Sequence, residues 1–445
     1  MLRKLLTTAT LIGGLLTLQA YAQTQSQCIG CHKQVTPGIV EQFLAGKMGK
    51  AGIDCSACHG KEHNSMDDYS KAKMPTPDTC KKCHPVQVEQ FRAGKHDLGW
   101  IAFKAMPMVS HQPKAIVGDG YKGCSGCHKI GRKTPEELAH YRYGNAQCDA
   151  CHTRHTFSKA EALSPRACSN CHMGFDHPQW EMYMSAKHGI IWAIDGEKPN
   201  GRAPTCQYCH MPEGNHNVVT PWGFLALRLP TKENVLALIK VAPQLESELR
   251  ALAEKLPSGH YIDLDDDPQW TLDRAIILQG IGVLDEKFQP TERLEIVLKA
   301  RVVRGPEEFN KLRLAMKKRC YTCHSKPFID KQFTAADEVI KHSDHLFAKA
   351  ISAVQGLYRD GILKKPPGWK YAPDILQFYE APTSIEQKLY LIFLEYRQRA
   401  FQGAFHISND YSHWYGWAPL KETVVEILEK AKEMRELHNL KTSSK

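Results

Sequence analysis

The residues best suited to chemistry in this chain are its cysteines, and all of them lie in Cys-x-x-Cys-His motifs. The sequence has 16 cysteines, and eight such motifs account for every one. In each motif, two thiols can form thioether bonds to a porphyrin and the adjacent histidine can ligate its iron. The motifs, numbered first to eighth, are Cys28/Cys31/His32, Cys55/Cys58/His59, Cys80/Cys83/His84, Cys124/Cys127/His128, Cys148/Cys151/His152, Cys168/Cys171/His172, Cys206/Cys209/His210 and Cys320/Cys323/His324.

Zinc ribbons and disulfide scaffolds are the other structures that use closely paired cysteines. A zinc ribbon needs no histidine after every pair, and a disulfide places no constraint on the residue that follows it. Because all eight pairs precede a histidine, the sequence predicts eight covalently attached haem c groups. No cysteine remains for nucleophilic catalysis or for a structural disulfide.

The remaining histidines are candidates for the sixth ligand of each iron. The chain has 22 histidines, of which eight follow the cysteine pairs. A pure electron conduit would use eight more as distal ligands, whereas an enzyme needs at least one open iron. Turns rich in glycine and lysine, and the segment C-H-T-R-H, favour distal ligation. The predicted distal ligands are His63, His96, His155, His188, His216 and His406, with His111 or His140 as a weaker seventh, while His342, His345 and His438 lie on charged helical faces and are expected to be solvated.

An acid–base pair follows the sixth motif, where Asp176 and His177 stand side by side before Pro178. A carboxylate can orient an imidazole, and the ordinary imidazole pKa near 6.5 suits proton transfer at neutral pH. The alternative interpretation is that His177 is one more distal ligand. Both interpretations remain open from the residues alone.

The elements that position these groups differ along the chain. Seven motifs lie between Cys28 and His210, a stretch too dense in haem to build a conventional aliphatic core. Porphyrins must therefore supply much of its buried apolar surface. Short helices are predicted at residues 36–44 and 85–92, where Thr36 can cap and Pro37 suits the first helical position.

The C-terminal third has the periodicity of long helices. Apolar residues recur at helical spacing in residues 307–318, 335–358, 385–403 and 423–438. The predicted fold class is mainly α with little β: a multihaem cytochrome c with a haem-packed N-terminal region and a C-terminal long-helix domain. The predicted division is a signal peptide at 1–22, a haem-rich domain with seven haems at 23–230, a connecting region at 231–300, and the eighth haem with the helical domain at 301–445.

The N-terminus and the charge both indicate a compartment outside the cytoplasm. Arg3 and Lys4, a short apolar run and Ala20-Tyr21-Ala22 form a signal-peptide pattern, with cleavage expected after about Ala22 and a periplasmic destination. The apolar run is shorter than the roughly 20 residues that a membrane span needs, so no membrane span is expected. The net charge of +10 is offset by the haem propionates, some of which should pair with lysine and arginine. We therefore expect no nucleic-acid partner.

Several longer segments resemble a known family. They are C-H-T-R-H-T-F-S, C-H-M-G-F-D-H-P-Q-W-E-M-Y, A-K-H-G, A-P-T-C-Q-Y-C-H-M-P-E-G-N-H-N-V-V-T-P-W-G-F-L-A-L-R-L-P and F-H-I-S-N-D-Y-S-H-W-Y-G-W. In order and spacing they are similar to the octahaem hydroxylamine oxidoreductase (hydroxylamine dehydrogenase) family. The resemblance implies seven bis-histidine haems, a five-coordinate catalytic haem at the fourth motif, and a homotrimer. In oxidising members a C-terminal tyrosine of the next subunit is bonded to the catalytic haem.

Carried over by motif, the catalytic haem is the one attached at Cys124 and Cys127 and ligated by His128. Asp176 and His177 would then line its open face. The resemblance makes Tyr411 the first candidate for the cross-link and Tyr415 the second. One departure is Lys47-Met48-Gly49-Lys50, where a histidine would be expected before the second motif. Either Met48 is incidental, or one haem has a different sixth ligand and a different potential.

Three functions follow as hypotheses. The first is a cytochrome-linked oxidation of hydroxylamine to nitric oxide or nitrite, with a small c-type cytochrome as the expected electron acceptor. The second is the reduction of nitrite or nitric oxide to hydroxylamine or ammonia on the same scaffold. The third is a pure electron-transfer conduit. The two tyrosines favour oxidation, because cross-linked members of the family oxidise and unlinked members are expected to reduce.

Overall fold

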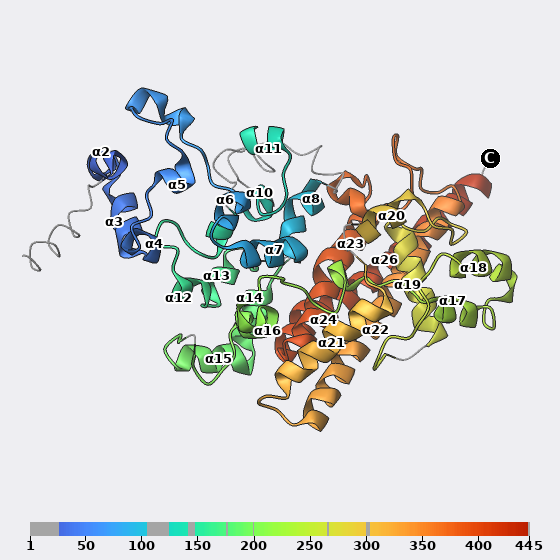
Figure 1. The fold of residues 1–445 in the computed structure, drawn as a ribbon. Coiled ribbons are helices and arrows are strands. Elements are labelled where there is room, and N and C mark those ends of the chain that lie inside the picture. Colours follow the sequence, from blue (N-terminus) through green and yellow to red (C-terminus); the bar gives the residue numbers. More distant parts are fainter. Residues whose placement is uncertain are drawn as a thin grey trace, which may run out of the picture. The chain divides into compact units, whose positions relative to one another are not determined.

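The computed structural model describes residues 26–104, 124–140, 147–174, 177–198, 200–264, 267–299 and 303–443, so the predicted signal peptide at 1–22 lies outside the described residues. Within these ranges helices are the regular elements, and β-structure is limited to an isolated bridge between Leu284 and Pro290 (Figure 1). The predicted mainly α fold is confirmed. In the described part of the chain, no helix is both long and apolar enough to cross a membrane.

The chain divides into two compact units. The first unit combines Met1–His84 with Asn145–Ala162, and the second combines Pro85–Gly144 with Leu163–Lys445. The first, second, third and fifth motifs therefore lie in the first unit, and the fourth, sixth, seventh and eighth lie in the second. The division at residues 230 and 300 that composition suggests stays a prediction.

Short helices and turns make up the first unit. Ser26 caps its first helix by accepting a hydrogen bond from the Ile29 amide, and Pro37 occupies the first turn of the next, as the sequence predicts. Most of these helices bury few or none of their side chains. They are α2 (Gln27–Val35), α3 (Pro37–Ala45), α4 (Lys47–Lys50), α5 (Ser56–His59), η1 (Met66–Lys71), α6 (Pro77–Lys81), η6 (Cys148–Ala150) and α12 (Lys159–Ala162).

The second unit begins with short helices around the remaining motifs and continues into longer ones. The short elements are α7 (Pro85–Ala93), η2 (Lys95–Leu98), α8 (Gly99–Lys104), α10 (Cys124–His128), α11 (Pro135–His140), α13 (Arg166–Ser169), α14 (Gln179–Ser185), α15 (Lys187–Ile194), α16 (Cys206–His210), η7 (Pro212–Gly214) and η8 (Phe224–Ala226). The later elements are α17 (Lys232–Leu238), η9 (Pro243–Leu245), α18 (Glu246–Ala253), α19 (Pro268–Gly280), α20 (Glu292–Lys299), α21 (Pro306–Cys320), α22 (Lys326–Arg359), η10 (Ile375–Glu380), α23 (Ser384–Leu391), η11 (Ile392–Tyr396), α24 (Arg397–Phe405), α25 (Asn409–Tyr411), η12 (Ser412–Trp417) and α26 (Ala418–Ser443).

An aliphatic core holds the long helices of the second unit together. Helix α22 packs against α19, α24 and α26, which lie side by side in Figure 1. Phe347 and Ile351 of α22 are fully buried, as is Ile427 of α26. On α26 the apolar face follows Val424, Ile427, Ala431 and Met434. Leu428 and Leu437, which belong to the same predicted apolar segment at 423–438, are exposed. These two leucines fall outside the stripe that a period of 3.6 residues directs at α22.

Two π-helical turns interrupt the last helices. The predicted continuous helix at residues 385–403 is observed as α23, the π turn η11 and α24, and a second π turn, η12, precedes α26. At the second π turn a Cβ on Gly416 would lie 2.3 Å from the Ala400 amide nitrogen. The Ser412 hydroxyl donates to the Ala400 carbonyl at 2.6 Å. Glycine is required at position 416 because the two backbones approach so closely.

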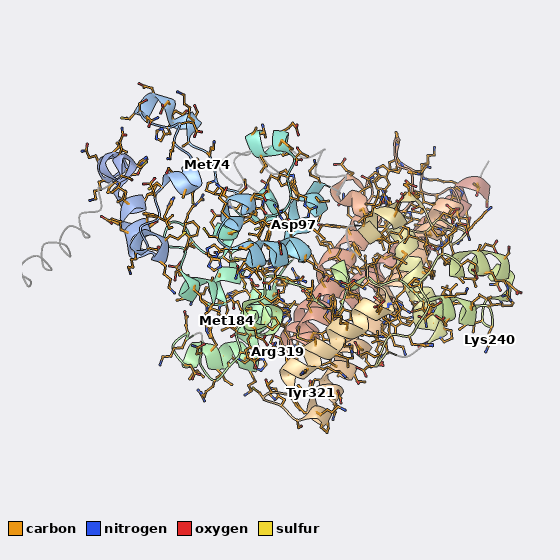
Figure 2. All side chains as sticks on the ribbon, viewed as in Figure 1. Met74, Asp97, Met184, Lys240, Arg319 and Tyr321 are labelled. Atoms are coloured by element: carbon orange, nitrogen blue, oxygen red, sulfur yellow. The ribbon has the colours of Figure 1, made fainter. Side chains whose placement is uncertain are left out.

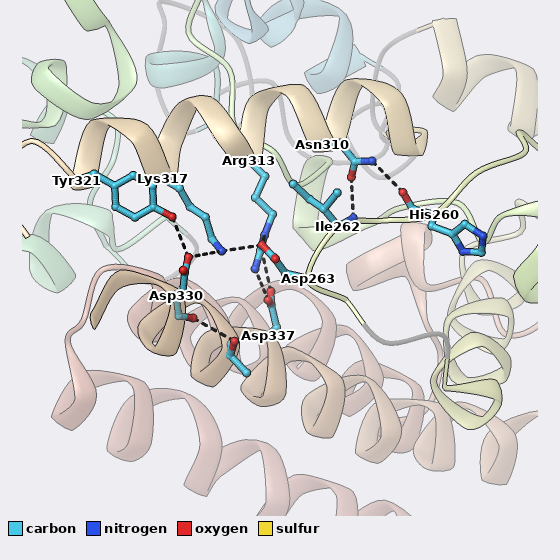
Figure 3. A network of polar contacts seen from close by, with 10 residues as sticks. His260, Ile262, Asp263, Asn310, Arg313, Lys317, Tyr321, Asp330 and Asp337 are labelled. Atoms are coloured by element: carbon cyan, nitrogen blue, oxygen red, sulfur yellow. Dashed lines mark hydrogen bonds and ion pairs between the residues drawn. The ribbon is translucent and has the colours of Figure 1, made fainter. Parts of the chain in front are cut away.

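A charged network joins α21 to α22 (Figure 3). Arg313 is buried and pairs with Asp263 and with Asp337, while Lys317 bridges Asp263 and Asp330. At the end of α21, close to the eighth motif, lie Arg319 and Tyr321 (Figure 2). The network fixes the helix that carries the eighth motif to the long helix α22.

Candidate haem sites and catalytic centre

The cysteines of the eight motifs differ in how deeply the fold buries them, although all eight motifs have the same sequence pattern. Cys31 is exposed, because α2 buries none of its side chains, whereas Cys151 and Cys171 are partly buried. The side chain of Cys124 lies outside the described residues. Attachment of haem at each thiol stays a prediction. Of the other motif cysteines, Cys83 and Cys323 are exposed, and Cys28, Cys55, Cys58, Cys80, Cys127, Cys148, Cys168, Cys206, Cys209 and Cys320 are partly buried.

Five proximal histidines face a second histidine across a gap of constant width. The ring centres of the facing histidines lie 6.0 to 6.4 Å apart. An iron atom bonded to one nitrogen of each ring, with bonds of about 2 Å, sets ring centres about 6 Å apart. The residues present therefore fit a haem iron between them. The pairs are His32–His63, His59–His155, His172–His96, His324–His188 and His210–His406.

The outward ring nitrogen of several of these histidines is held by a hydrogen bond. A metal-binding histidine commonly uses its second nitrogen in this way, which fixes the ring and leaves the other nitrogen for the metal. The Nδ1 contacts are His32 to Thr36 Oγ1 at 2.7 Å, His59 to the Lys73 carbonyl at 2.9 Å, His63 to Asp68 Oδ1 at 2.8 Å, His128 to the Gly99 carbonyl at 3.3 Å, His172 to Gln179 Oε1 at 3.2 Å and His406 to the Gln402 carbonyl at 2.8 Å.

Burial keeps the central imidazoles in the form that binds metal. Burial lowers the pKa of His96 to about 4, with a further contribution from His172. The pKa of His210 is also lowered to about 4, first by burial and then by His406. A neutral imidazole can donate a lone pair to iron, whereas a protonated one cannot. These rings are therefore neutral ligands at any physiological pH.

Contacts between cysteines of different motifs reveal which motifs are neighbours. In the first unit, the interaction of Cys80 with the Cys148 thiol lowers the pKa of Cys80 to about 7 and raises that of Cys148. In the second unit, Cys168 and Cys206 interact in the same way. The third and fifth motifs are thus adjacent, as are the sixth and seventh. Since thioether formation consumes these thiols, the contacts matter as a measure of proximity.

In the second unit, the fourth motif is the first of a row of neighbouring motifs. Its Cys127 thiol contacts the Asn170 carbonyl, inside the sixth motif, at 3.8 Å. Charge interactions of Cys209 with Cys320 and Cys323 connect the seventh motif to the eighth. Four of the eight motifs, in the order fourth, sixth, seventh and eighth, thus form a continuous path within one unit.

The proximal histidine of the fourth motif is fixed from two sides. The Gly99 carbonyl of α8 accepts from His128 Nδ1, and the Phe103 ring stacks on the imidazole at 5.9 Å. An ion pair of 2.6 Å between buried Asp97 (Figure 2) and Arg132 ties the turn after the motif to the start of α8. A Cβ on Gly99 would lie 2.7 Å from the Ile130 carbonyl oxygen, so this close approach requires glycine.

His177 lies opposite the fourth motif. Its ring centre is 6.1 Å from that of His128 and 6.4 Å from that of His172, with interplanar angles of 73° and 69°. The sequence analysis expects His177 at the fourth motif, and its ring contacts the proximal histidines of both the fourth and the sixth motifs. Its predicted partner Asp176 lies outside the described residues. The separation from His128 matches that of the ligand pairs, so the geometry accommodates both a sixth ligand and a group that exchanges protons above the iron.

The other predicted distal ligands are placed less directly. His216 lies in a turn where its amide bonds Gln90 Oε1 at 3.1 Å, and His140 is exposed at the end of α11. His111 lies outside the described residues. These three stay predictions as distal ligands. His345, which was expected to be solvated, is half-buried and bonds Asp273 at 3.0 Å, because α22 packs against α19.

The two candidate tyrosines stack on each other within the chain. The rings of Tyr411 and Tyr415 lie 4.8 Å apart at 24°, and burial raises the pKa of Tyr411. Tyr415 is 55% exposed and the adjacent Trp414 is 63% exposed, whereas Tyr411 is half-buried. The π turn η12 presents the more exposed aromatic rings on one short segment.

Sequence reasoning missed the residues that hold the ligand rings. Thr36 follows His32 by four positions, Gln402 precedes His406 by four, and Asp68 follows His63 by five. Such local spacing is a usable signal, because a residue about one helical turn away lies near the ring. Gly99 and Lys73, which use carbonyls of distant segments, leave no such signal.

The sequence is similar to several known proteins. Residues 24–235 match a family model described as a seven-times multi-haem cytochrome CxxCH. A probable nitrite reductase-hydroxylamine oxidoreductase fusion protein of Kuenenia stuttgartiensis is 25% identical, over 92% of this chain and 52% of its own length. The multiheme cytochrome MtrA of Shewanella baltica is 24% identical over 41% of this chain and 53% of its own. The chain spans about half the length of these curated relatives.

Solved structures show the same fold. A reducing HAO-like protein complex of Kuenenia stuttgartiensis has a TM-score of 0.63 at 22% identity, over 94% of this chain and 86% of the other. A hypothetical multiheme protein has a TM-score of 0.62 at 19% identity, over 97% and 98%. The region that matches the family model, residues 24–235, is that of a multihaem c-type cytochrome. Some of the proteins that the chain resembles are named as HAO-like or as a hydroxylamine oxidoreductase fusion.

Proposed function

We propose that this protein is an octahaem oxidoreductase that oxidises hydroxylamine to nitric oxide or nitrite at the haem of the fourth motif. The observation that carries the proposal is the position of His177. Its ring faces His128 and also contacts His172, the proximal histidine of the sixth motif. A proton acceptor thus lies beside both the site of substrate binding and the first step of the electron path.

The chain's residues account for protons and for orientation in this reaction. Conversion of hydroxylamine to nitric oxide releases three protons and three electrons. A bound haem would supply the iron that binds the substrate nitrogen and the route for the electrons. His177 accepts a proton, as an imidazole can near neutral pH. The Gly99 carbonyl and the Phe103 ring hold His128 in place, and Asp176 is proposed as the second acceptor.

The same proposal assigns the other sites. The five facing histidine pairs would hold bis-histidine haems, and His216 and either His111 or His140 are proposed as further distal ligands. We further propose export to the periplasm after cleavage near Ala22, a small c-type cytochrome as electron acceptor, and a homotrimer in which Tyr411 or Tyr415 reaches the fourth-motif haem of the next subunit. The exposed side chains of η12 support an intermolecular role for this segment.

Reduction of nitrite or nitric oxide is the second candidate function. Two observations favour it: a relative of this chain is named as a nitrite reductase fusion, and a solved structure of the same fold is named as a reducing HAO-like complex. Within one chain, moreover, Tyr411 stacks on Tyr415. A tyrosine that stays stacked and unbonded would leave the fourth-motif haem able to deliver electrons.

Mass spectrometry of haem peptides from the boiled, reduced holoprotein separates the two candidates. Oxidation predicts a peptide of residues 124–128 joined to one containing Tyr411 or Tyr415, and a covalent trimer on a denaturing gel. The matched Tyr411→Phe and Tyr415→Phe variants identify the bonded residue. A monomer with eight ordinary haem peptides would contradict the oxidative proposal, and turnover should then be found with nitrite or nitric oxide.

The role of His177 needs its own test. His177→Gln should lower turnover of hydroxylamine at least a hundredfold, since a positioned proton acceptor contributes on the order of 10² to 10⁴ in rate. If His177 is instead a sixth ligand, the variant gains a high-spin ferric signal in electron paramagnetic resonance that the wild type lacks. His342→Gln, on the exposed face of α22, is the matched control and should change neither property.

A further inference from the structure

Arg304 is a buried guanidinium with few partners. The residue is 1% exposed, and its Nε and Nη2 atoms have no hydrogen-bond acceptor in the described structure. Its Nη1 atom forms an ion pair with Glu308, a side chain that is 45% exposed. Buried guanidinium donors without acceptors are costly, because they lose their water. The fold therefore calls for a further acceptor at this place.

Two other buried donors lie in the same region. Lys95 Nζ donates to the Thr220 hydroxyl at 3.3 Å and to the Trp222 carbonyl at 3.1 Å. The Lys95 ammonium is close enough to the Arg304 guanidinium for the two charges to interact. Trp222 is 6% exposed, and its Nε1 has no acceptor in the described structure. Three chain segments thus contribute N–H groups to one buried place, a donor set suited to an anion.

This donor set adjoins the histidine pair of the seventh motif. The Trp222 ring contacts the Phe405 ring at 6.2 Å, and Phe405 immediately precedes His406. The charge of Lys95 also acts on His210, the proximal partner of His406. The nearest cofactor would therefore be the haem between His210 and His406, which carries two carboxylates on flexible side chains.

We propose that Arg304, Lys95 and Trp222 bind a propionate carboxylate of the haem held by His210 and His406. A carboxylate accepts strong charge-assisted hydrogen bonds from guanidinium and ammonium groups. The assignment also accounts for the difference between Arg304 and Arg228. Arg228 is equally buried, but its charge lies 4.3 to 5.1 Å from the centres of the Trp270, Tyr261 and Trp222 rings, which stabilise a cation directly.

The test uses the holoprotein with haem labelled by ¹³C at the propionate carboxyls, from cells fed [1-¹³C]5-aminolevulinate. Redox-induced infrared difference spectra of Arg304→Gln and Trp222→Phe should show a shifted labelled carboxylate band. Arg304→Gln should also lower one midpoint potential, because a nearby positive charge favours the reduced haem. The expected change is about tenfold in the redox equilibrium, or about 59 mV for one electron. His406→Met should shift the midpoint potential of the haem held by His210 and His406, which shows whether Arg304→Gln acts on that same haem.

Control variants distinguish a bound propionate from a diffusible anion. Arg435→Gln, at an exposed ion pair with Asp360, should leave every band and potential unchanged. If the wild-type potential changes when chloride is exchanged for gluconate, Arg304→Gln loses this dependence, and the labelled bands do not move, a diffusible anion occupies the site and the proposal is overturned. A shift confined to the haem of His172 and His96 would overturn the assignment. If Arg304→Gln does not fold, Trp222→Phe and Arg304→Lys decide: unmoved labelled bands in both contradict the proposal.

Discussion

Helices α2, α4 and α5 of the first unit bury no side chain, whereas α22 of the second unit buries thirteen of its 34 residues. The first unit holds four haem motifs on about a hundred residues, so its polypeptide alone has little apolar surface to remove from water. The long helices of the second unit instead pack around buried aliphatic and aromatic side chains. From this comparison we expect haem to be a structural component of the first unit, whereas the helical part of the second unit has its own core.

Removal of one haem should therefore affect the two regions very differently. Cys80→Ser with Cys83→Ser should destroy the protease resistance of the first unit. A haem that buries on the order of 400 Å² contributes about 10 kcal/mol at 25 cal/mol per Å², as much as the whole stability of a domain. Limited proteolysis with mass spectrometry should locate new cuts within residues 26–84 and 147–162.

The matched control removes the eighth haem, which follows the long helix α21. Cys320→Ser with Cys323→Ser should leave the helices α19, α22, α24 and α26 resistant, because Phe347 and its neighbours form their core. Equal sensitivity of both double variants would mean that the haems stabilise the two regions alike.

A cavity in the aliphatic core should destabilise the long helices and leave the haem groups unaffected, the opposite of removing a haem from the first unit. Phe347 is fully buried and stacks on Phe393 at 5.8 Å. Phe347→Ala should reduce the free energy of unfolding by about 3 to 5 kcal/mol, measured by urea denaturation, while the haem absorption spectrum stays unchanged. Leu440→Ala, at a residue 68% exposed, is the control. A loss below about 1 kcal/mol for Phe347→Ala would show that the helices do not depend on this core.

The buried charges of the helical part predict a pH dependence. Burial raises the pKa of Asp337 to about 6, although Arg313 opposes the rise. In the unfolded chain the carboxyl titrates near pH 3.9, so between about pH 4 and 6 the folded protein keeps a proton that the unfolded chain releases. The contribution of Asp337 to stability is therefore present at low pH and falls by up to about 3 kcal/mol as pH rises through this window.

Urea denaturation of the wild type and Asp337→Asn at pH 4, 5, 6 and 7 measures this contribution. The difference in unfolding free energy should fall with rising pH. For Asp330→Asn, measured down to pH 3, the difference should instead rise with pH and level off above about pH 4, because Lys317 and Tyr321 lower the pKa of Asp330. The same sign for both variants would contradict the assignment of the buried carboxyl.

The smallest expected effect concerns one ligand of the first unit. Asp68 accepts from His63 Nδ1 at 2.8 Å and from the Asn64 and Ser65 amides. A carboxylate in this position increases the basicity of the imidazole and stabilises ferric iron. Asp68→Asn should raise the potential of the haem at His32 by a few tens of mV, less than the roughly 59 mV of a tenfold change. Spectroelectrochemistry would detect the shift, and exposed Asp67→Asn should show none.

The long helices were predictable because their apolar residues repeat with the helical period. Residues 335–358 lie inside α22, which extends further at its N-terminal end through the more polar segment from Lys326. The π turns were not predictable, since a single extra residue hardly changes the apolar pattern of residues 385–403. The roles of Gly416 and Ser412 can be recognised only in the structure, where both lie against the backbone of Ala400.

At the candidate site, local sequence predicted which residues matter better than it predicted their partners. His63 and His188 stood out in their turns, but their opposing partners, His32 and His324, are separated from them by 31 and 136 residues. Likewise, nothing in the sequence near Arg304 indicates Lys95 or Trp222. These relations depend on how segments pack, and packing among haems has no period that a sequence pattern can reveal.

The π turn at Ser412–Trp417 has a consequence for tolerated changes in chain length. Each residue of an α-helix advances the helix face by about 100°, and a π turn absorbs one residue beyond the regular winding. Deleting a single residue there would restore a regular helix and leave α26 facing the core. A deletion at the start of α26 itself would instead turn the helix by about 100° and move Val424, Ile427 and Ala431 out of the core, so the π turn is the place where this helix tolerates the loss of one residue.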